Sequence, residues 1–190
     1  MLKDNKWRNP AAIVECEWLF NRLGDENIRI FDCTTYLHYT DDHPSKPYDV
    51  ESGFSDYKKN SIPGAAFIDV QNDLSDQNSI YSLTLPNFQR LGESIKQLGI
   101  GDPYHVILYA RNGMQWATRV WYLLHALGYE NVSILNGGFN EWSRLNFPIE
   151  RGGTTFSPAE FNLAIKEGKF VDKNSVFTAI NDNNTVIIII

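Results

Sequence analysis

The sequence has few cysteines, no cluster of basic side chains and no apolar run long enough to cross a membrane. Only two of its 190 residues are cysteine, Cys16 and Cys33, and their spacing indicates neither a disulfide framework nor a metal site. The four histidines also lack the spacing of metal ligands. The sequence therefore predicts a protein without a metal and without a cofactor.

The balance of charge is acidic, because 23 Asp and Glu residues outnumber 17 Lys and Arg residues and give a formal net charge of −6. This balance argues against nucleic acid as a partner. Residues 1–6 are polar and lack the apolar core of a signal peptide. We therefore expect a cytoplasmic protein that binds neither nucleic acid nor a membrane.

Apolar residues make up 43% of the sequence, which is enough for one domain with a substantial core. Short apolar runs at 28–32, 105–109 and 132–135 indicate buried strands, with a further short strand near 66–68. Helical spacing is found at 15–23, 86–98 and 116–127, whereas 34–50 is expected to be a polar loop. This alternation is typical of an α/β domain with a mainly parallel sheet covered by helices on both faces.

The loop between the strand 105–109 and the helix 116–127 carries the main candidate site. A loop in this position points several backbone N–H groups at one spot, and the helix dipole adds positive potential there. Such a place suits an anion or a thiolate. The candidate anion-binding residues are Ala110, Arg111, Asn112, Gly113, Met114 and Gln115 in the loop and Arg119 in the helix.

Ala110 stands first in this loop, where an enzyme that used the geometry for nucleophilic catalysis would place a cysteine. Alanine cannot attack, so the sequence predicts no catalytic residue here. Arg111 is expected to face the solvent, and Arg119 is expected to form an ion pair or to bond a loop carbonyl. Cys16 is expected to pack as a small hydrophobe. Cys33 follows the strand 28–32 and is expected to be a half-buried thiol, with a sulfur-carrying role as the alternative.

Several of these segments resemble the rhodanese-like sulfurtransferases. The resemblance rests on residues 108–110, 117–122, 127–132 and 135–139, on Trp142, and on Ile62-Pro63-Gly64-Ala65, where Ser61 replaces the family's usual histidine. It implies a three-layer domain with a five-stranded sheet in the order 3-2-4-5-1. More narrowly, the chain resembles the N-terminal half of tandem-domain thiosulfate and 3-mercaptopyruvate sulfurtransferases, in which the second domain carries the catalytic cysteine.

The resemblance also suggests how the chain is divided. Residues 1–150 would form a rhodanese-like domain without a catalytic cysteine, and 151–190 a linker followed by the truncated start of a second domain. Asp172 is a plausible N-cap for a short helix over 173–179. Residues 185–190, which end in four isoleucines, are expected to form a buried central strand.

Three functions remain open from the sequence. The first is the non-catalytic half of a sulfurtransferase that supports a missing catalytic domain, with a small sulfur-containing anion as the ligand of the full-length protein. The second is a free-standing module that binds an anion or a protein through the loop. The third is a persulfide carrier that uses Cys33. Because of Ala110, we expect the isolated chain to be inactive, and the choice between thiosulfate and 3-mercaptopyruvate as sulfur donor stays open.

Overall fold

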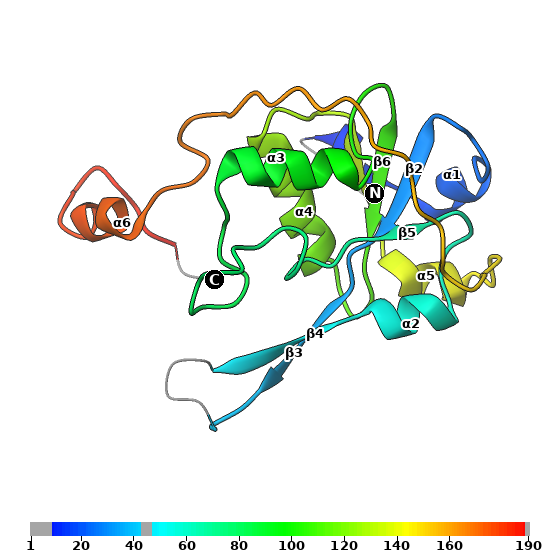
Figure 1. The fold of residues 1–190 in the computed structure, drawn as a ribbon, viewed down its shortest axis with the longest axis horizontal. Coiled ribbons are helices and arrows are strands. Elements are labelled where there is room, and N and C mark those ends of the chain that lie inside the picture. Colours follow the sequence, from blue (N-terminus) through cyan, green and yellow to red (C-terminus); the bar gives the residue numbers. More distant parts are fainter. Residues whose placement is uncertain (1–8, 43–46, 189–190) are drawn as a thin grey trace, which may run out of the picture.

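The computed structural model describes residues 9–42 and 47–188, and a parallel five-stranded sheet lies at its centre (Figure 1). The strands of this sheet are β1 (Ile13–Val14), β2 (Ile28–Asp32), β5 (Ala66–Phe67), β6 (His105–Tyr109) and β7 (Val132–Leu135). Their order across the sheet is β1-β7-β6-β2-β5, and every neighbouring pair is parallel. Counted along the chain, this is the order 3-2-4-5-1, so the predicted sheet is confirmed.

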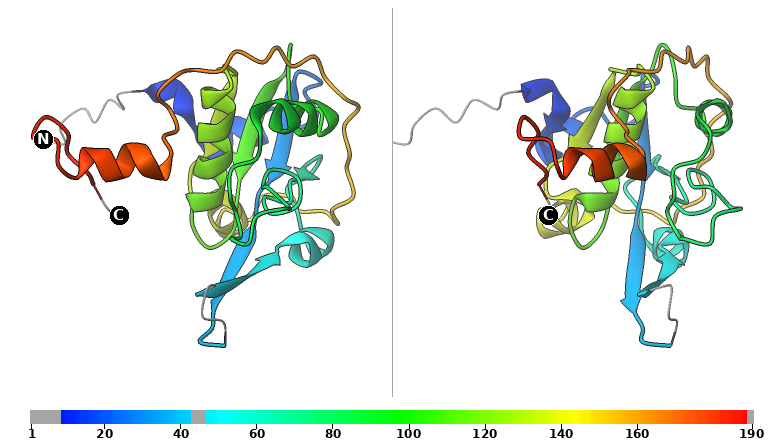
Figure 2. Two further views of the ribbon diagram at one scale, coloured as in Figure 1. Left: turned by 60° about the vertical axis from the view of Figure 1, so that its left-hand side comes forward. Right: turned by 90° about the vertical axis from the view of Figure 1, so that its left-hand side faces the viewer.

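Helices cover both faces of the sheet and make the domain three layers thick (Figures 1 and 2). On one face, α3 (Phe88–Gln97) and α4 (Gln115–Ala126) pack on β2, β6 and β7. On the other face, α1 (Cys16–Phe20) and α5 (Gly138–Arg144) bury Leu19 and Trp142 against Ile107 and Tyr109 of β6. The central strand β6 is almost entirely apolar because both of its faces are buried, whereas β2 also carries the buried side chains of Arg29 and Asp32.

The ends of the helices differ in part from the expected ones. The helix expected over 86–98 begins at Phe88, after Asn87, whose side chain accepts a hydrogen bond from the N–H of Gln89 at 2.8 Å. Pro86 therefore lies before the helix and not in its first turn, because the Asn87 cap fixes the start. The α1 helix ends at Phe20 and continues as turns, so it is shorter than the expected 15–23. A short 3₁₀ helix, Pro10–Ala12, precedes β1.

A β-hairpin projects from the body of the domain (Figure 1). It consists of β3 (Thr35–Tyr39) and β4 (Tyr48–Ser52), which pair antiparallel, and α2 (Phe54–Lys59) follows it. The expected polar loop over 34–50 is therefore wrong for these strands. Cross-strand contacts stabilise the pair, as between the rings of Tyr39 and Tyr48, which lie 6.4 Å apart. Pro44 lies outside the described residues, and Pro47 directly precedes β4.

Residues 150–170, which we call the strap, run along the surface of the domain and are anchored at intervals. Glu150 exchanges two backbone hydrogen bonds with Ser61, at 2.7 and 3.0 Å. Further anchors are Gly153 N–H to Tyr57 Oη at 2.9 Å, Asp102 N–H to Glu160 O at 2.8 Å, Lys166 N–H to Ala126 O at 2.8 Å, and Tyr122 Oη–H to Lys169 O at 2.7 Å. The strap is thus packed on the domain along its length, whereas the division of the chain at residue 150 stays a prediction.

One anchor of the strap is the guanidinium of Arg29, a residue that is only 5% exposed. This guanidinium lies 3.5 Å from the ring centre of Tyr104 and 4.9 Å from that of Phe156 in the strap. It also donates hydrogen bonds to the carbonyls of Gly99 and, at 2.9 Å, Ser157. A charged side chain from β2 therefore fastens the strap through both ring and carbonyl contacts.

After the strap, the chain forms α6 (Lys173–Ala179) and a final described segment up to residue 188. Asp172 caps α6 by accepting a hydrogen bond from the N–H of Ser175 at 2.8 Å, which confirms the expected N-cap. Val186 and Ile188 are 84% and 78% exposed, and residues 185–188 form no strand. The expected buried strand is therefore wrong for 185–188, because no described strand lies beside them to pair with; residues 189 and 190 lie outside the described residues. None of the described helices has both the length and the apolar character needed to span a membrane.

Candidate functional site

The loop that follows β6 lies at the carboxyl edge of the sheet, between the ends of β2 and β7. Ala110, its first residue, is 3% exposed, and its carbonyl accepts a hydrogen bond from the N–H of Phe139 at 3.2 Å. Gly138 makes this approach feasible, because a Cβ added there would lie only 2.3 Å from the Ala110 oxygen. The loop then turns through Asn112 and Gly113, which have φ values of 56° and 117°.

The backbone N–H groups of the loop are only partly used. Arg111 donates its N–H to Oγ1 of Thr34 at 3.1 Å. The N–H groups of Asn112, Gly113 and Met114 have no acceptor among the residues that the structure describes. The loop therefore keeps free donors of the kind that bind anions, while its first side chain is a methyl group. Anion binding at this loop stays a prediction.

Arg111 does not face the solvent, so that expectation is wrong. Its side chain is 11% exposed, and its guanidinium lies 3.7 Å from the ring centre of Phe139. Its Nε lies 3.6 Å from Oδ2 of Asp32, and it also donates a hydrogen bond to the carbonyl of Asn60. Phe139 of α5 and Asp32 of β2 enclose the Arg111 side chain, and we call this place the slot. Both residues are far from Arg111 in the sequence.

Asp32 is fully buried and caps the turn after β2. Its Oδ1 accepts hydrogen bonds from the N–H of Thr34 at 2.9 Å and from the Thr34 hydroxyl. Burial raises the pKa of Asp32 above its usual value, although Thr34 and Arg111 act in the opposite direction. Asp69 caps a turn in the same way, by accepting from the N–H of Asn72 at 2.9 Å. Both carboxylates therefore have the expected structural role.

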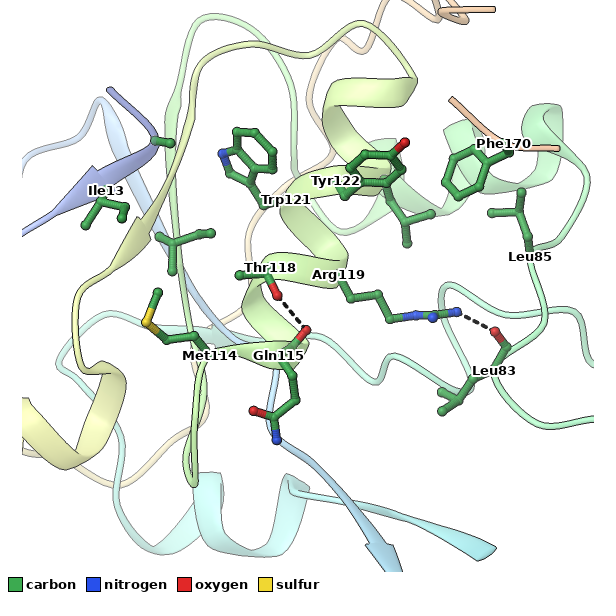
Figure 3. Close-up of a pocket in the computed structure, with 13 residues that line it drawn as sticks. Ile13, Leu83, Leu85, Met114, Gln115, Thr118, Arg119, Trp121, Tyr122 and Phe170 are labelled. Carbon is green, nitrogen blue, oxygen red and sulfur yellow. Dashed lines mark hydrogen bonds between the residues drawn. The ribbon is translucent and has the colours of Figure 1, made fainter. Parts of the chain in front are cut away.

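Arg119 lies in the wall of a cavity of about 770 Å³ beside α4 (Figure 3). Its Nη2 donates a hydrogen bond to the carbonyl of Leu83, which confirms the expected bond to a loop carbonyl. Met114 and Gln115 line the same cavity. The structure therefore does not bring all the predicted anion-binding residues together: Arg111 lies beside Asp32, whereas Met114, Gln115 and Arg119 line the cavity.

Both cysteine thiols are buried. Cys33 is fully buried and not half-buried as expected, because its side chain belongs to the core cluster that α3 and α4 cover; its N–H donates a hydrogen bond to the carbonyl of Tyr109 at 2.8 Å. Burial, and next the charge of Asp32, raise the pKa of the Cys33 thiol well above its usual value. Burial also raises the pKa of Cys16 to about 12, and this residue packs as a small hydrophobe, as expected. Within 9–42 and 47–188, no group of three or more His, Cys, Asp or Glu residues is placed to hold a metal.

Sequence patterns did not indicate the cavity beside α4. Its walls include Leu83 and Leu85 from a loop, Phe170 from the strap and Ile13 from β1. These residues are far apart along the chain and each has an ordinary apolar side chain. The sequence feature that could have indicated the cavity is Arg119, a positively charged residue among the apolar residues of α4.

The model of the rhodanese-like domain matches residues 15–145. The chain belongs to the rhodanese-like family. It is 32% identical over 160 residues to human 3-mercaptopyruvate sulfurtransferase, which covers 81% of this chain and 50% of the relative. It is 30% identical over 175 residues to the Escherichia coli K12 3-mercaptopyruvate sulfurtransferase, covering 92% and 59%, and 29% identical over 161 residues to mouse thiosulfate sulfurtransferase, covering 81% and 50%.

Among solved structures, the rhodanese-like chain is similar to the crystal structure of SseA from Escherichia coli, described as a 3-mercaptopyruvate sulfotransferase. The TM-score is 0.75 at 28% identity, with 90% of this chain and 62% of the other covered. The chain spans about half the length of the curated relatives it matches. The match confirms the fold and places the chain among the relatives of 3-mercaptopyruvate and thiosulfate sulfurtransferases.

Proposed function

We propose that this chain is the non-catalytic N-terminal domain of a tandem sulfurtransferase of the 3-mercaptopyruvate or thiosulfate class, located in the cytoplasm, which supports a separate catalytic domain. The observation that carries the proposal is Ala110, which stands at the start of the loop with the free N–H groups. The length of the relatives, about twice the matched part, leaves room for a second domain.

Sulfur transfer in this class uses a thiolate. The thiolate attacks the sulfane sulfur of thiosulfate or the thiol sulfur of 3-mercaptopyruvate and takes it up as a persulfide. The S–S or C–S bond of the donor breaks, sulfite or the enolate of pyruvate leaves with the electron pair, and a thiophilic acceptor then removes the sulfur. The methyl group of Ala110 cannot form this bond. The thiols of Cys16 and Cys33 are buried and have raised pKa values, so neither presents a thiolate to a donor. The reactive thiol of the proposed protein therefore belongs to the other domain.

Two alternatives keep specific support. A free-standing anion- or protein-binding module is supported by the unused N–H groups of Asn112, Gly113 and Met114. A persulfide carrier through Cys33 is supported by its place at the carboxyl end of β2, but its complete burial counts against it. In both cases the chain would act without a second domain.

The first test is formation of thiocyanate from cyanide by the purified chain, with thiosulfate and 3-mercaptopyruvate as separate donors. We expect no turnover with either donor. Turnover that disappears in a Cys33→Ala variant would establish Cys33 as the sulfur carrier and would refute the proposal. Turnover that survives this substitution but disappears in a Cys16→Ala variant would assign the activity to Cys16 and would refute the proposal as well, whereas turnover that survives both substitutions would come from a contaminant.

The supporting role is tested with a chimera. Residues 1–170 replace the N-terminal half of the Escherichia coli relative, and transfer from 3-mercaptopyruvate is measured. We expect transfer by the chimera, and none when the catalytic cysteine of the Escherichia coli half is changed to serine. A folded chimera without activity, beside an active parent enzyme, would favour the free-standing module.

A further inference from the structure

The cavity beside α4 is built from five separate parts of the chain (Figure 3). Tyr122 of α4 lies on the side of the helix that faces Leu83 and Leu85, whereas Trp121 points away from them, toward Ile13 of β1 (Figure 3). The strap contributes Phe170, which contacts Tyr122 with ring centres 5.4 Å apart. The cavity volume of about 770 Å³ falls in the range of small-molecule sites, which are concave and mostly apolar.

One positive charge lies in this apolar wall. The guanidinium of Arg119 bonds the carbonyl of Leu83 through Nη2, while its Nε is buried and has no hydrogen-bond partner. Among the described residues, no carboxylate lies within ion-pair distance of Arg119. The charge is therefore partly desolvated without a counter-ion, a situation that is unfavourable unless an anion is bound.

The other polar side chains of the cavity do not contact the guanidinium. Gln115 and Thr118 line the cavity but point away from the Arg119 guanidinium, and the Thr118 hydroxyl donates to the carbonyl of Gln115 at 2.9 Å (Figure 3). The Nη1 group of Arg119 has no acceptor among the described residues. A carboxylate matches such a group well, because a guanidinium offers two parallel N–H donors in one plane.

From these observations we propose that the cavity binds a small amphipathic carboxylate, with its aromatic or alkyl body against Leu85, Tyr122 and Phe170 and its carboxylate on Arg119. The apolar walls favour a ligand with an aromatic or alkyl body, and the guanidinium without a counter-ion favours a ligand with a negative charge. This proposal does not depend on sulfur transfer, because none of the groups involved needs to react. It describes a binding site on the side of α4, separate from the slot that holds Arg111 and Asp32.

The test uses 2-naphthoate as the probe, with 2-naphthamide as a neutral analogue of the same shape and acetate as a carboxylate without an apolar body. Binding to the full chain is measured by titration calorimetry, and the site is located by NMR through contacts between the naphthoate protons and the ring protons of Tyr122 and Phe170. We expect one naphthoate per chain, bound at least tenfold more tightly than naphthamide, and no binding of acetate. Equal affinities for naphthoate and naphthamide, or no naphthoate binding at millimolar concentration, would overturn the proposal.

Three variants assign the site. Arg119→Gln is expected to lower the affinity for naphthoate at least tenfold and to leave the affinity for naphthamide unchanged. Phe170→Glu places a carboxylate at the rim and is expected to weaken naphthoate strongly; because Phe170 is partly exposed, this variant tests the site even if Arg119→Gln does not fold. Phe177→Glu on the exposed face of α6 is the matched control and should change nothing. Loss of binding in Phe177→Glu, with binding retained in Phe170→Glu, would locate the probe on α6 and refute the proposal.

Discussion

Oδ2 of Asp32 and Nε of Arg111 face each other at 3.6 Å inside the domain, and neither atom has a hydrogen-bond partner in the described structure. The pair connects the end of β2 to the first turn of the loop after β6. It is a long contact between a fully buried carboxylate and a guanidinium that is 11% exposed. The attraction therefore offsets only part of the desolvation of Asp32, in agreement with the raised pKa of this carboxyl group.

The raised pKa of Asp32 predicts a pH dependence of stability. The folded protein holds the Asp32 proton more tightly than the unfolded chain, so its stability falls as the pH rises from about 4 through the folded-state pKa. An Asp32→Asn variant has no carboxyl group to ionise at this position, so its stability does not fall for this reason, and its amide oxygen can still accept the hydrogen bonds from Thr34. We expect its free energy of unfolding, relative to the wild type, to improve with rising pH in urea titrations between pH 4 and 7. The opposite trend would mean that the attraction of Arg111 outweighs burial.

Arg29 is predicted to hold the strap. An Arg29→Met variant keeps much of the volume but loses the bonds to Gly99 and Ser157 and the ring contacts, so we expect a loss of about 2–4 kcal/mol in the free energy of unfolding. Limited proteolysis should then cut first within the strap. The matched control is Arg22→Met, since Arg22 stacks on Trp18 at the surface and should account for less than about 1 kcal/mol. Equal losses in the two variants would contradict the anchoring role.

Substitution of Gly138 is predicted to destabilise the protein more than substitution of a glycine with open space around it. A Gly138→Ala variant has an unfavourable φ of +57° and a Cβ that meets the Ala110 carbonyl, so we expect a loss of roughly 2–5 kcal/mol. Gly168→Ala has a similar φ of +74° but open space around the added Cβ, and should lose only about 1 kcal/mol. Thermal unfolding of the two variants separates the close approach from backbone strain. Similar melting temperatures would show that the contact with Ala110 adds nothing.

The two thiols are predicted to be unreactive in the folded protein. Because burial raises both pKa values, we expect no reaction of Cys16 or Cys33 with DTNB at pH 8, and reaction of both thiols once urea unfolds the chain. Mass spectrometry after incubation with thiosulfate or 3-mercaptopyruvate should show no added sulfur. A persulfide on Cys33 in the folded chain would reopen its role as a sulfur carrier.

Part of this structure followed from the sequence for clear physical reasons. The strands at 28–32, 105–109 and 132–135 were predicted with the observed bounds, because strands buried on both faces are mostly apolar. The helix expected over 116–127 is α4, displaced by one residue. The order of the strands came from the family resemblance, since apolar periodicity does not say which strands are neighbours.

The remaining features depend on contacts between distant residues. Arg111 was expected in solvent because nothing near it in the sequence indicates Phe139 or Asp32 as neighbours. The hairpin of β3 and β4 lacks a continuous apolar run, and residues 185–188 have a strand pattern without a neighbouring strand. The cavity beside α4 shows the same limit, because its walls meet only in the folded chain.

The strap also determines how the domain would respond to a pulling force. Its anchors are arranged one after another, from Lys169 at Tyr122 back to Glu150 at Ser61. Tension applied beyond Phe170 would break these hydrogen bonds one at a time in that order, because the force acts on only one anchor at a time. Arg29, which holds Phe156 and Ser157, would resist detachment of the strap about halfway along its length, before the sheet itself carried any force. The domain would therefore yield at its carboxyl side in small steps and keep its centre intact until the strap had come away.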